Sequence, residues 1–399
     1  MTRLPPTPDF DTYAVPADIR SVTTEKDGRV LRLAWSDGRS SRFHAIWLRD
    51  NSCDPGNLNL ETRETTVNVT ALPTDPRVVE AHIDAAGALA VRWSPGASLH
   101  RFHPGWLYAH DYSNGAQPHD PGVVPVAWDA TLAEPPTFDG ADILTDDTAL
   151  EAWLKAFATY GIARLTGVGV EPGTVARVAA RLGPMRVTNF GRIFEVRVQA
   201  GPGSNAYTAL ALPPHTDLST RKYQPGLQFL HCLVNDSAGG EAIMVDGLAL
   251  ARFVAARDPE AYALLTTVRW QSSNRALDTD YRWDHPVIRL DDAGEVVELR
   301  VVPFLRAPLA TDFDQVERAY ASLRVAYEAA ANPALQMRFS YRPGDLVAID
   351  NRRVLHGREA HDPDSGERWL QGCYSEREEL LSRLRILARQ RRGTERAGR

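Results

Sequence analysis

The sequence predicts a mainly β protein with helices, in which a double-stranded β-helix (jelly-roll) domain follows a small N-terminal β domain. Three observations lead to this expectation. The first hundred residues contain a duplicated, strand-like pattern. Short apolar runs recur along the rest of the chain with helical segments between them, as is typical of a barrel supported by helices. At 399 residues the chain exceeds a usual single domain, which favours one large and one small domain.

The internal repeat defines the N-terminal domain, which is expected over residues 18–112. The segment 31–48 reads LRLAWSDG, then RFH, then WL, and the segment 89–107 reads LAVRWSPG, RFH and WL. Each copy alternates apolar and polar residues, turns at a glycine and returns, which predicts a β-hairpin. Because a single hairpin buries little surface, two facing copies are expected to form one small domain. His44 and His103 occupy equivalent places in the copies, which favours a packing role.

Residues 113–140 contain five prolines and are expected to be a linker, and residues 141–391 are expected to form the jelly-roll domain. The expected strands are 162–166, 227–234, 242–245, 296–302, 346–349 and 369–374. The expected helices are 147–160, ended by Gly161, then 172–183, 249–257, 260–267, 313–330 and 376–389.

Composition excludes several functional classes. A net charge of −6 and a pI near 6.0 argue against a nucleic-acid-binding surface. No apolar run approaches the roughly 20 residues that span a bilayer, and the N-terminus lacks the apolar segment of a secretion signal. Three cysteines are too few for a disulfide framework. Cys232 and Cys373 lie in apolar strand-like runs and are expected to be buried, and a cytoplasmic location is expected.

A His-x-Asp pair followed by a distant histidine predicts a metal site. Two neutral imidazoles and a carboxylate, here His215, Asp217 and His356, form the facial ligand set of non-haem Fe(II). The other face of the metal stays open for a bidentate oxo acid and dioxygen. In an extended strand residues i and i+2 point to the same side, so the third ligand must come from a neighbouring strand. A second copy, His82-Ile-Asp84, has no such partner and is assigned no function.

Arg368 predicts a co-substrate site. It follows His356 by twelve residues, on the strand-like run Arg-Trp-Leu-Gln-Gly-Cys-Tyr. A guanidinium there is able to bind the distal carboxylate of 2-oxoglutarate through a bidentate pair.

Four motifs together resemble the γ-butyrobetaine hydroxylase family of TauD/TfdA-like 2-oxoglutarate oxygenases. They are HTDL from His215, QPGLQFLHC from Gln224, DNRRVLHGR from Asp350 and QGCY from Gln371. The N-terminal domain shares the likeness through WLRDN from Trp47 and HPGWL from His103, so the resemblance covers nearly the whole chain.

The resemblance implies roles for particular residues. His215, Asp217 and His356 match the iron ligands, and Arg368 matches the residue that binds 2-oxoglutarate. In this family an aromatic box holds the trimethylammonium head of the substrate, and four residues match its walls: Tyr207, Tyr374, Phe190 and Phe194. A quaternary ammonium cannot donate N–H hydrogen bonds, so aromatic faces hold it by cation–π attraction. The alternative is that these four side chains belong only to the core.

The chain departs from the family pattern in three places. The family's N-terminal domain often binds zinc through cysteines, but the corresponding positions are Ser52, Asp54 and Asn57, so no zinc is expected. A Ser or Thr that often helps to hold 2-oxoglutarate is replaced by Ala242. An Asn that helps to seat the substrate carboxylate is replaced by Pro303, so the anionic end of the substrate is left open.

These observations predict an Fe(II)- and 2-oxoglutarate-dependent hydroxylase that acts on an unactivated C–H bond of a small quaternary-ammonium acid. The first candidate substrate is γ-butyrobetaine. The alternatives are the same chemistry on trimethyllysine, a trimethylammonium phosphonate or a natural-product intermediate and, more remotely, a non-catalytic ligand-binding barrel. The expected partners are the small-molecule substrate and O2, with no nucleic acid or membrane. The resemblance also implies stimulation by ascorbate and a homodimer.

Overall fold

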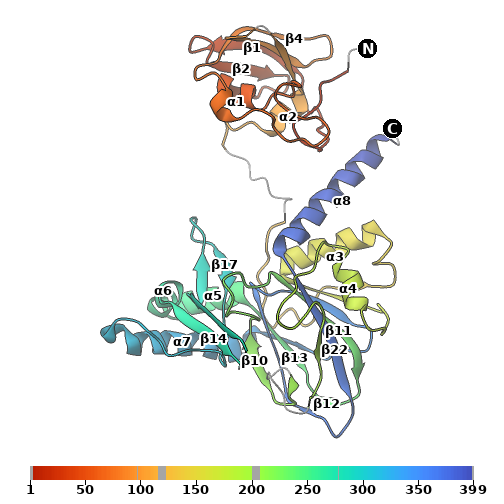
Figure 1. Cartoon of the computed structure of the whole chain (residues 1–399), viewed down its shortest axis with the longest axis vertical. Helices are drawn as coiled ribbons and strands as arrows, with labels where there is room; N and C mark the ends of the chain where they lie inside the picture. The colour runs from red at the N-terminus through yellow and green to blue at the C-terminus, as the bar shows by residue number, and fades with distance from the viewer. Residues whose placement is uncertain (1–2, 97, 116–122, 200–206, 277, 398–399) are drawn as a thin grey trace. The chain divides into compact units, whose positions relative to one another are not determined.

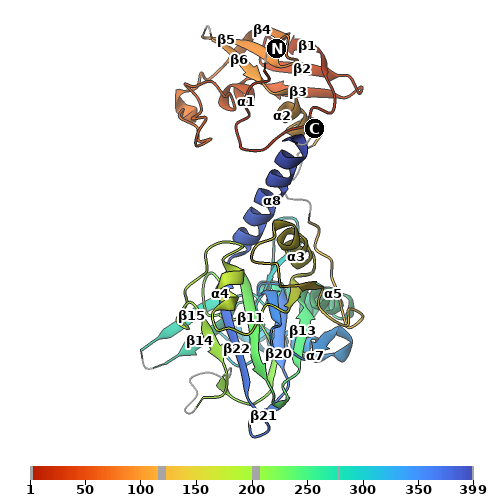
Figure 2. The same cartoon turned by 90° about the vertical axis from the view of Figure 1, so that its right-hand side faces the viewer.

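The computed structural model describes residues 3–96, 98–115, 123–199, 207–276 and 278–397. The chain forms two compact units, one comprising Met1–Asp120 with Ala388–Arg399, the other comprising Pro121–Leu387. Figures 1 and 2 show strands in both units and most of the helices in the second. None of the helices in the described residues combines the length and apolar content needed to cross a membrane.

The N-terminal unit repeats one arrangement twice, as the duplicated sequence predicts. Each copy is an antiparallel three-stranded sheet followed by a short helix. The first comprises β1 (Ile19–Glu25), β2 (Val30–Trp35), β3 (Ser40–His44) and α1 (Ala45–Asp50), and the second comprises β4 (Arg77–Ile83), β5 (Leu89–Ser94), β6 (Leu99–Phe102) and α2 (Pro104–Ala109). The repeated tryptophans meet in one core, where the rings of Trp47 and Trp106 stack 5.1 Å apart. His103 has the packing role expected of it, since its Nδ1 accepts the N–H groups of Gly105 and Trp106 and caps α2.

Two sheets form the jelly-roll of the second unit. The six-stranded sheet has the order β7 (Thr137–Asp139), β8 (Ile162–Thr166), β19 (Leu346–Asp350), β11 (Leu227–Asn235), β22 (Arg368–Ser375) and β9 (Phe194–Val196). The four-stranded sheet has the order β10 (Leu212–His215), β20 (Val354–Arg358), β13 (Ala242–Asp246) and β18 (Gln336–Phe339). Their facing side chains, among them Leu230, Met244, Val347 and Leu370, form an apolar core. Cys232 and Cys373 are buried and unpaired, as expected.

Helices cover the outer faces of these sheets (Figures 1 and 2). Against the six-stranded sheet pack α3 (Asp147–Tyr160), α4 (Thr174–Ala179) and the first half of α8 (Arg377–Ala397). Helix α3 begins at the N-cap Asp146 and ends, as predicted, at Gly161 with φ +70°. A second cluster is formed by α5 (Gly247–Arg257), α6 (Pro259–Thr267) and α7 (Val316–Ala331).

The remaining strands are short pairs at the margins of the barrel. They are β12 (Ala238–Gly239) with β21 (His361–Asp362), β14 (Trp270–Arg275) with β15 (Asp280–His285), and β16 (Ile288–Leu290) with β17 (Val296–Leu299).

The segment expected to be a linker, 113–140, differs from that expectation in its second half. Trp128 is buried in the core between the two sheets, and its indole N–H donates to Tyr160 O. Residues Thr137–Asp139 form β7, which pairs in parallel with β8. The prolines therefore predict irregular backbone correctly, but the second half of this segment packs as part of the jelly-roll domain and is not a linker.

Candidate active site

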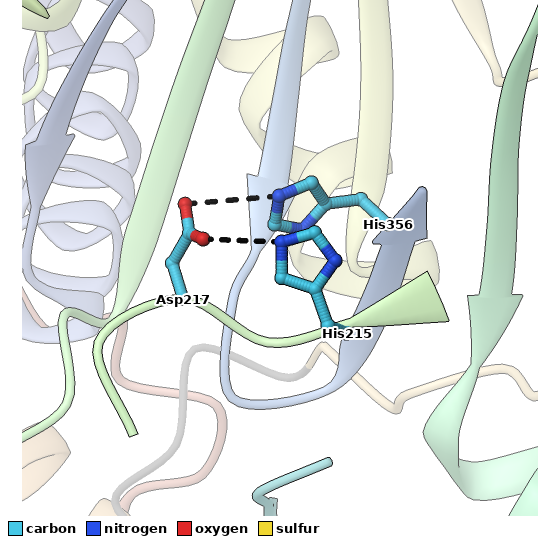
Figure 3. A group of neighbouring side chains, drawn as sticks. All are labelled: His215, Asp217 and His356. Atoms are coloured by element: carbon cyan, nitrogen blue, oxygen red, sulfur yellow. Dashed lines mark ion pairs between the residues drawn. The ribbon is translucent and has the colours of Figure 1, made fainter. Parts of the chain in front are cut away.

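Three predicted ligands meet at one point of the jelly-roll, as Figure 3 shows. The Nε2 atom of His215 lies 3.4 Å from one carboxylate oxygen of Asp217, and the Nε2 atom of His356 lies 3.7 Å from the other. One nitrogen or oxygen atom from each of the three residues lies within 4.8 Å of the others. The two imidazole centroids are 4.4 Å apart. This is a compact N, N, O set that opens into a cavity.

The position of the two histidines comes from sheet pairing. Strands β10 and β20 are antiparallel neighbours, and His215 is the cross-strand partner of His356. Directly opposed residues on adjacent strands project to the same face at close distance. The separation of 141 positions along the chain therefore does not matter, because strand register alone brings the two rings together.

Asp217 reaches the site differently from the expected way. The sequence suggested that His215 and Asp217 share one extended strand, but β10 ends at His215 and Asp217 begins a turn. The next residue, Leu218, has φ +55°, a left-handed conformation that is unfavourable for a branched side chain. The side chains of His215 and Asp217 still lie on the same side, but the turn, not an extended strand, places them there. Side-chain hydrogen bonds then fix the position of Asp217.

Four hydrogen bonds hold Asp217. Its Oδ2 accepts the Tyr374 hydroxyl at 2.7 Å and the Gln228 amide at 2.6 Å. Its backbone N–H donates to Asn351 Oδ1 at 2.7 Å, and Asn351 Nδ2 donates back to the Asp217 carbonyl at 3.1 Å. Sequence reasoning missed Gln228 and Asn351 as supporting residues, although both lie inside the quoted motifs. For Gln228 the available signal was an amide side chain inside the otherwise apolar strand β11. Asn351 lies in the turn after β19, among charged residues, and carried no such signal.

The protonation states suit a cation between the three groups. His215 Nδ1 lies 2.9 Å from Pro213 O, so this nitrogen carries the proton and Nε2 presents a lone pair. Burial lowers the pKa of His356 to about 4, with the nearby His215 adding to the effect and Asp217 opposing it, so His356 is neutral near pH 7. Burial raises the pKa of Asp217, but His356, His215 and the Tyr374 hydroxyl outweigh it and hold that pKa below its usual range. Lone pairs facing a carboxylate repel unless a cation lies between them, so the residues fit a divalent metal.

Arg368 lines the same cavity, at a distance from Tyr374. Arg368 and Tyr374 are both on β22, six residues apart, so they share a face of the sheet with roughly 20 Å of strand between them. Arg368 is buried, and among the described residues no carboxylate pairs with it. Burial of this kind lowers the pKa of a guanidinium, as it does for Arg368, and is unfavourable without an anionic partner. The geometry indicates a ligand carboxylate.

A second guanidinium lies near Ala242. Arg358 is the cross-strand partner of Ala242 and lines the cavity. Its terminal nitrogen donates to Thr208 O, whereas its Nε has no partner among the described residues. Burial, together with the nearby Arg368, lowers the pKa of Arg358 to about 10. Ala242 therefore offers no hydroxyl to a ligand, but two guanidinium groups, those of Arg358 and Arg368, line the cavity.

The four predicted aromatic residues line one cavity. The Phe194 ring stacks on Tyr374 at 5.0 Å, and the Phe190 ring lies 6.5 Å from Phe194. Tyr207 also lines the cavity. A Cβ atom at Gly372 would lie 2.3 Å from the Phe194 ring, so glycine is required for this ring to lie against β22.

The three departures from the family pattern lie in different places. Ser52 and Asn57 are in the N-terminal unit, where Ser52 Oγ lies 2.5 Å from His100 Nδ1 and the Asn57 amide donates to three backbone carbonyls. Pro303 directly precedes Phe304, whose ring packs edge-on against the His215 ring with centroids 5.0 Å apart.

Comparisons with known proteins agree with this geometry. Residues 125–374 match the model of the Taurine catabolism dioxygenase TauD, TfdA family, and residues 22–110 match that of the Gamma-butyrobetaine hydroxylase-like, N-terminal family. The chain is 42% identical to a gamma-butyrobetaine dioxygenase of Pseudomonas sp. (strain AK-1), over 96% of this chain and 99% of the relative. It is 29% identical to the human gamma-butyrobetaine dioxygenase, over 90% and 94% of the two chains. It is also 29% identical to the mitochondrial trimethyllysine dioxygenase of Rattus norvegicus, over 87% and 83%.

The family match spans well over half of the chain, and the relatives are covered almost from end to end. Together with the His-Asp-His set, this extent of similarity assigns the enzyme class: the chain belongs to the TauD/TfdA family and is a 2-oxoglutarate-dependent oxygenase.

Proposed function

We propose that this protein uses Fe(II), 2-oxoglutarate and O2 to hydroxylate an unactivated C–H bond of a small quaternary-ammonium acid, with γ-butyrobetaine as the first candidate. One observation carries the proposal. A single cavity joins the His-Asp-His set to four aromatic rings and to a buried arginine that has no carboxylate partner within the described part of the chain. Those three features match an oxidising metal, an anionic co-substrate and a cationic substrate. The names of the most similar relatives support the same substrate.

His215, Asp217 and His356 are the proposed iron ligands. When bound, iron supplies the oxygen activation that couples decarboxylation of 2-oxoglutarate, to succinate and CO2, with hydroxylation of the substrate. The protein's own part is to keep the two Nε2 lone pairs and one carboxylate oxygen directed at one point. Gln228 and Tyr374 both bond to the other oxygen, Oδ2. This leaves Oδ1 as the oxygen that faces His215.

Arg368 is the proposed anchor for the distal carboxylate of 2-oxoglutarate. It is buried in the face of β22 that lines the cavity, and the described residues offer it no acid partner. A bidentate guanidinium–carboxylate pair in such surroundings is both strong and directional. The arginine therefore orients the co-substrate, with its oxo-acid end toward the His-Asp-His set.

Phe190, Phe194, Tyr207 and Tyr374 are the proposed walls for the ammonium group. Each ring contributes on the order of 0.5–2 kcal/mol when a cation lies over its face. Because Tyr374 also bonds to Asp217, it connects the cationic end of the substrate directly to the metal-ligand set. Enclosure by rings also excludes water from the reacting carbon.

A second candidate function keeps the chemistry and changes the substrate. Pro303, next to the Phe304 ring that packs on His215, has no side-chain donor for a substrate carboxylate. Trimethyllysine is supported by the similarity to trimethyllysine dioxygenases. A trimethylammonium phosphonate or a natural-product intermediate also satisfies an aromatic box with an altered anionic end.

The test is iron-dependent release of succinate from 2-oxoglutarate by the purified protein, measured with a panel of betaines, trimethylammonium phosphonates and methylated amino acids. We expect the fastest substrate-stimulated release with γ-butyrobetaine. Release that is fastest with another trimethylammonium compound would favour the second candidate. Absence of both oxygen uptake and succinate release in the presence of iron would favour a non-catalytic binding barrel instead.

A further inference from the structure

The part of the cavity near Arg368 holds a buried hydroxyl for which the described residues offer no partner. Tyr341 is 4% exposed and lines the cavity, and its OH makes no hydrogen bond among these residues. The Nε atoms of Arg368 and Arg358 are also buried and have no hydrogen-bond partner among the described residues. A buried hydroxyl that has lost water and gained no replacement is unfavourable, so three such donors lining one cavity indicate an acceptor that arrives with a ligand.

The fold brings Tyr341 to Arg368 through one connecting residue. Asn235 is the cross-strand partner of Arg368 in the β11–β22 pair. The Asn235 side-chain amide donates to the backbone carbonyl of Tyr341 at 2.8 Å. The start of β22 and the chain just beyond β18 are therefore tied together at this point, and both side chains face the cavity.

The same fold places Tyr341 near Ala242. Phe339 is the cross-strand partner of Ala242, and Tyr341 follows Phe339 by two residues. The two aromatic rings lie 5.4 Å apart, and both pack in the core between the sheets, to which Ala242 also contributes. Ala242 has only a methyl group, whereas Tyr341 carries a hydroxyl into the same core.

The chemistry of Tyr341 suits an anion. Burial raises the pKa of Tyr341 well above its usual value, with the nearby Arg368 acting in the opposite direction, so the hydroxyl stays protonated and donates. A carboxylate has two oxygens with about four lone-pair positions, and a guanidinium fork uses only part of them. A neutral hydroxyl can donate to a remaining lone pair of the ligand carboxylate without adding a third positive charge to those of Arg368 and Arg358.

We propose that Tyr341 is a second donor to the distal carboxylate of the oxo-acid co-substrate, beside Arg368, and supplies the hydroxyl that Ala242 lacks. This inference deepens the proposed function and rests on it, because the ligand is 2-oxoglutarate at the site described above.

The test compares wild type, Tyr341→Phe and the control Tyr327→Phe. Phenylalanine keeps the packing against Phe339 and removes only the hydroxyl. Tyr327 is a half-buried tyrosine of α7 that packs in the α5–α7 cluster and does not line the cavity. We expect the KM for 2-oxoglutarate to rise roughly 10-fold or more in Tyr341→Phe, as for loss of a hydrogen bond to a charged group. We expect kcat, the KM for the primary substrate and all parameters of Tyr327→Phe to change little.

A second measurement separates donation from packing. The competitive inhibitor 2-oxopentanoate keeps the oxo-acid end but lacks the distal carboxylate, so its inhibition constant should be equal in wild type and Tyr341→Phe. An unchanged KM for 2-oxoglutarate in Tyr341→Phe would overturn the inference. So would weakening of both compounds by the same factor, which assigns the effect to packing. If wild type itself neither binds nor consumes 2-oxoglutarate, the proposed function fails and this inference fails with it.

Discussion

The chain carries the pattern His-x-Asp in both of its units. The two copies differ in burial, in hydrogen-bond partners and in the residues that surround them. In the N-terminal unit His82 is largely exposed on β4, 3.4 Å from Glu80. Asp84 accepts the backbone N–H groups of Ala86 and Ala88 and pairs with Arg101, so it closes a turn. Both oxygens of the Asp84 carboxylate are therefore engaged by neighbouring groups of the N-terminal unit.

In the jelly-roll, His215 and Asp217 are accompanied by a buried histidine from the neighbouring strand, and Arg368 lines the same cavity. Here the lone pairs point at one another across an interior space instead of closing a turn. The pattern His-x-Asp alone therefore does not indicate a metal site, and only the copy in the jelly-roll combines it with a third possible ligand, burial and a cavity.

The largest expected effect tests this comparison directly. His215→Ala or Asp217→Ala should lower iron-dependent succinate release at least about 100-fold, since even residues that only support metal ligands change affinity or activity 10–100-fold. The matched variants His82→Ala and Asp84→Asn should leave release per folded molecule unchanged. Iron content and turnover are measured on the same preparations. Full activity in His215→Ala with iron supplied would contradict the assignment.

The arginines of the two regions provide the next contrast. Arg368→Leu should raise the KM for 2-oxoglutarate by at least about 30-fold, because truncating one partner of a buried charged pair typically costs about 2–5 kcal/mol. Arg101→Leu removes the partner of Asp84 and should leave that KM unchanged. If the KM in Arg368→Leu stayed at the wild-type value, the co-substrate anchor would have to be another basic residue, with Arg358 and then Arg306 next.

Aromatic side chains should also behave differently in the two units. Tyr374→Leu should weaken binding of the trimethylammonium substrate by about 0.5–2 kcal/mol for the lost ring, with little change in Tm. Trp106→Leu, in the stacked core of the N-terminal unit, should instead lower the Tm and leave the substrate KM of the folded enzyme unchanged.

Two additions sharpen this test. Tyr374→Phe keeps the ring and removes only the bond to Asp217, so it should weaken iron binding while preserving the preference for a cation. A neutral tert-butyl analogue of the substrate has the shape of the cation without its charge. Equal turnover of both compounds by wild type would remove the aromatic box from the proposal.

The smallest expected effect concerns zinc in the N-terminal unit. Dialysis against a chelator should leave its Tm unchanged, and metal analysis should find no stoichiometric zinc, because Ser52, Asp54 and Asn57 supply no thiolates. Ser52→Ala should lower stability by about 1 kcal/mol through loss of the bond to His100. Zinc that survives the chelator would show that the loop was wrongly aligned.

The sequence by itself determined the elements that have a strong local signal. The two equivalent hairpins of the N-terminal unit, β2–β3 and β5–β6, follow from the repeated alternation around a glycine turn, and α3 follows from its apolar face and from Gly161. Strands β1 and β4 and the short helices α1 and α2 were not predicted. The β14–β15 pair was not predicted: QSSNR after Trp270 contains no apolar residue, and in β15 only Tyr281 and Trp283 alternate with charged residues. The candidate ligand residues His215, His356 and Arg368 could also be selected from the sequence, because few side-chain types bind metals or carboxylates, and all three line one cavity.

Tertiary structure alone decided how those residues meet. The pairing of His215 with His356 depends on strand register across 141 residues, and the support of Asp217 depends on side chains from β11 and β22. Tyr341 lies near Arg368 and Ala242 because β18 pairs with β13 and because Asn235 of β11 bonds to the Tyr341 carbonyl. The alternation of apolar and polar residues along the chain predicts neither contact. Secondary structure follows from periodicity along the chain, but a site in a barrel is set by neighbours across it, and these can come from any sequence distance.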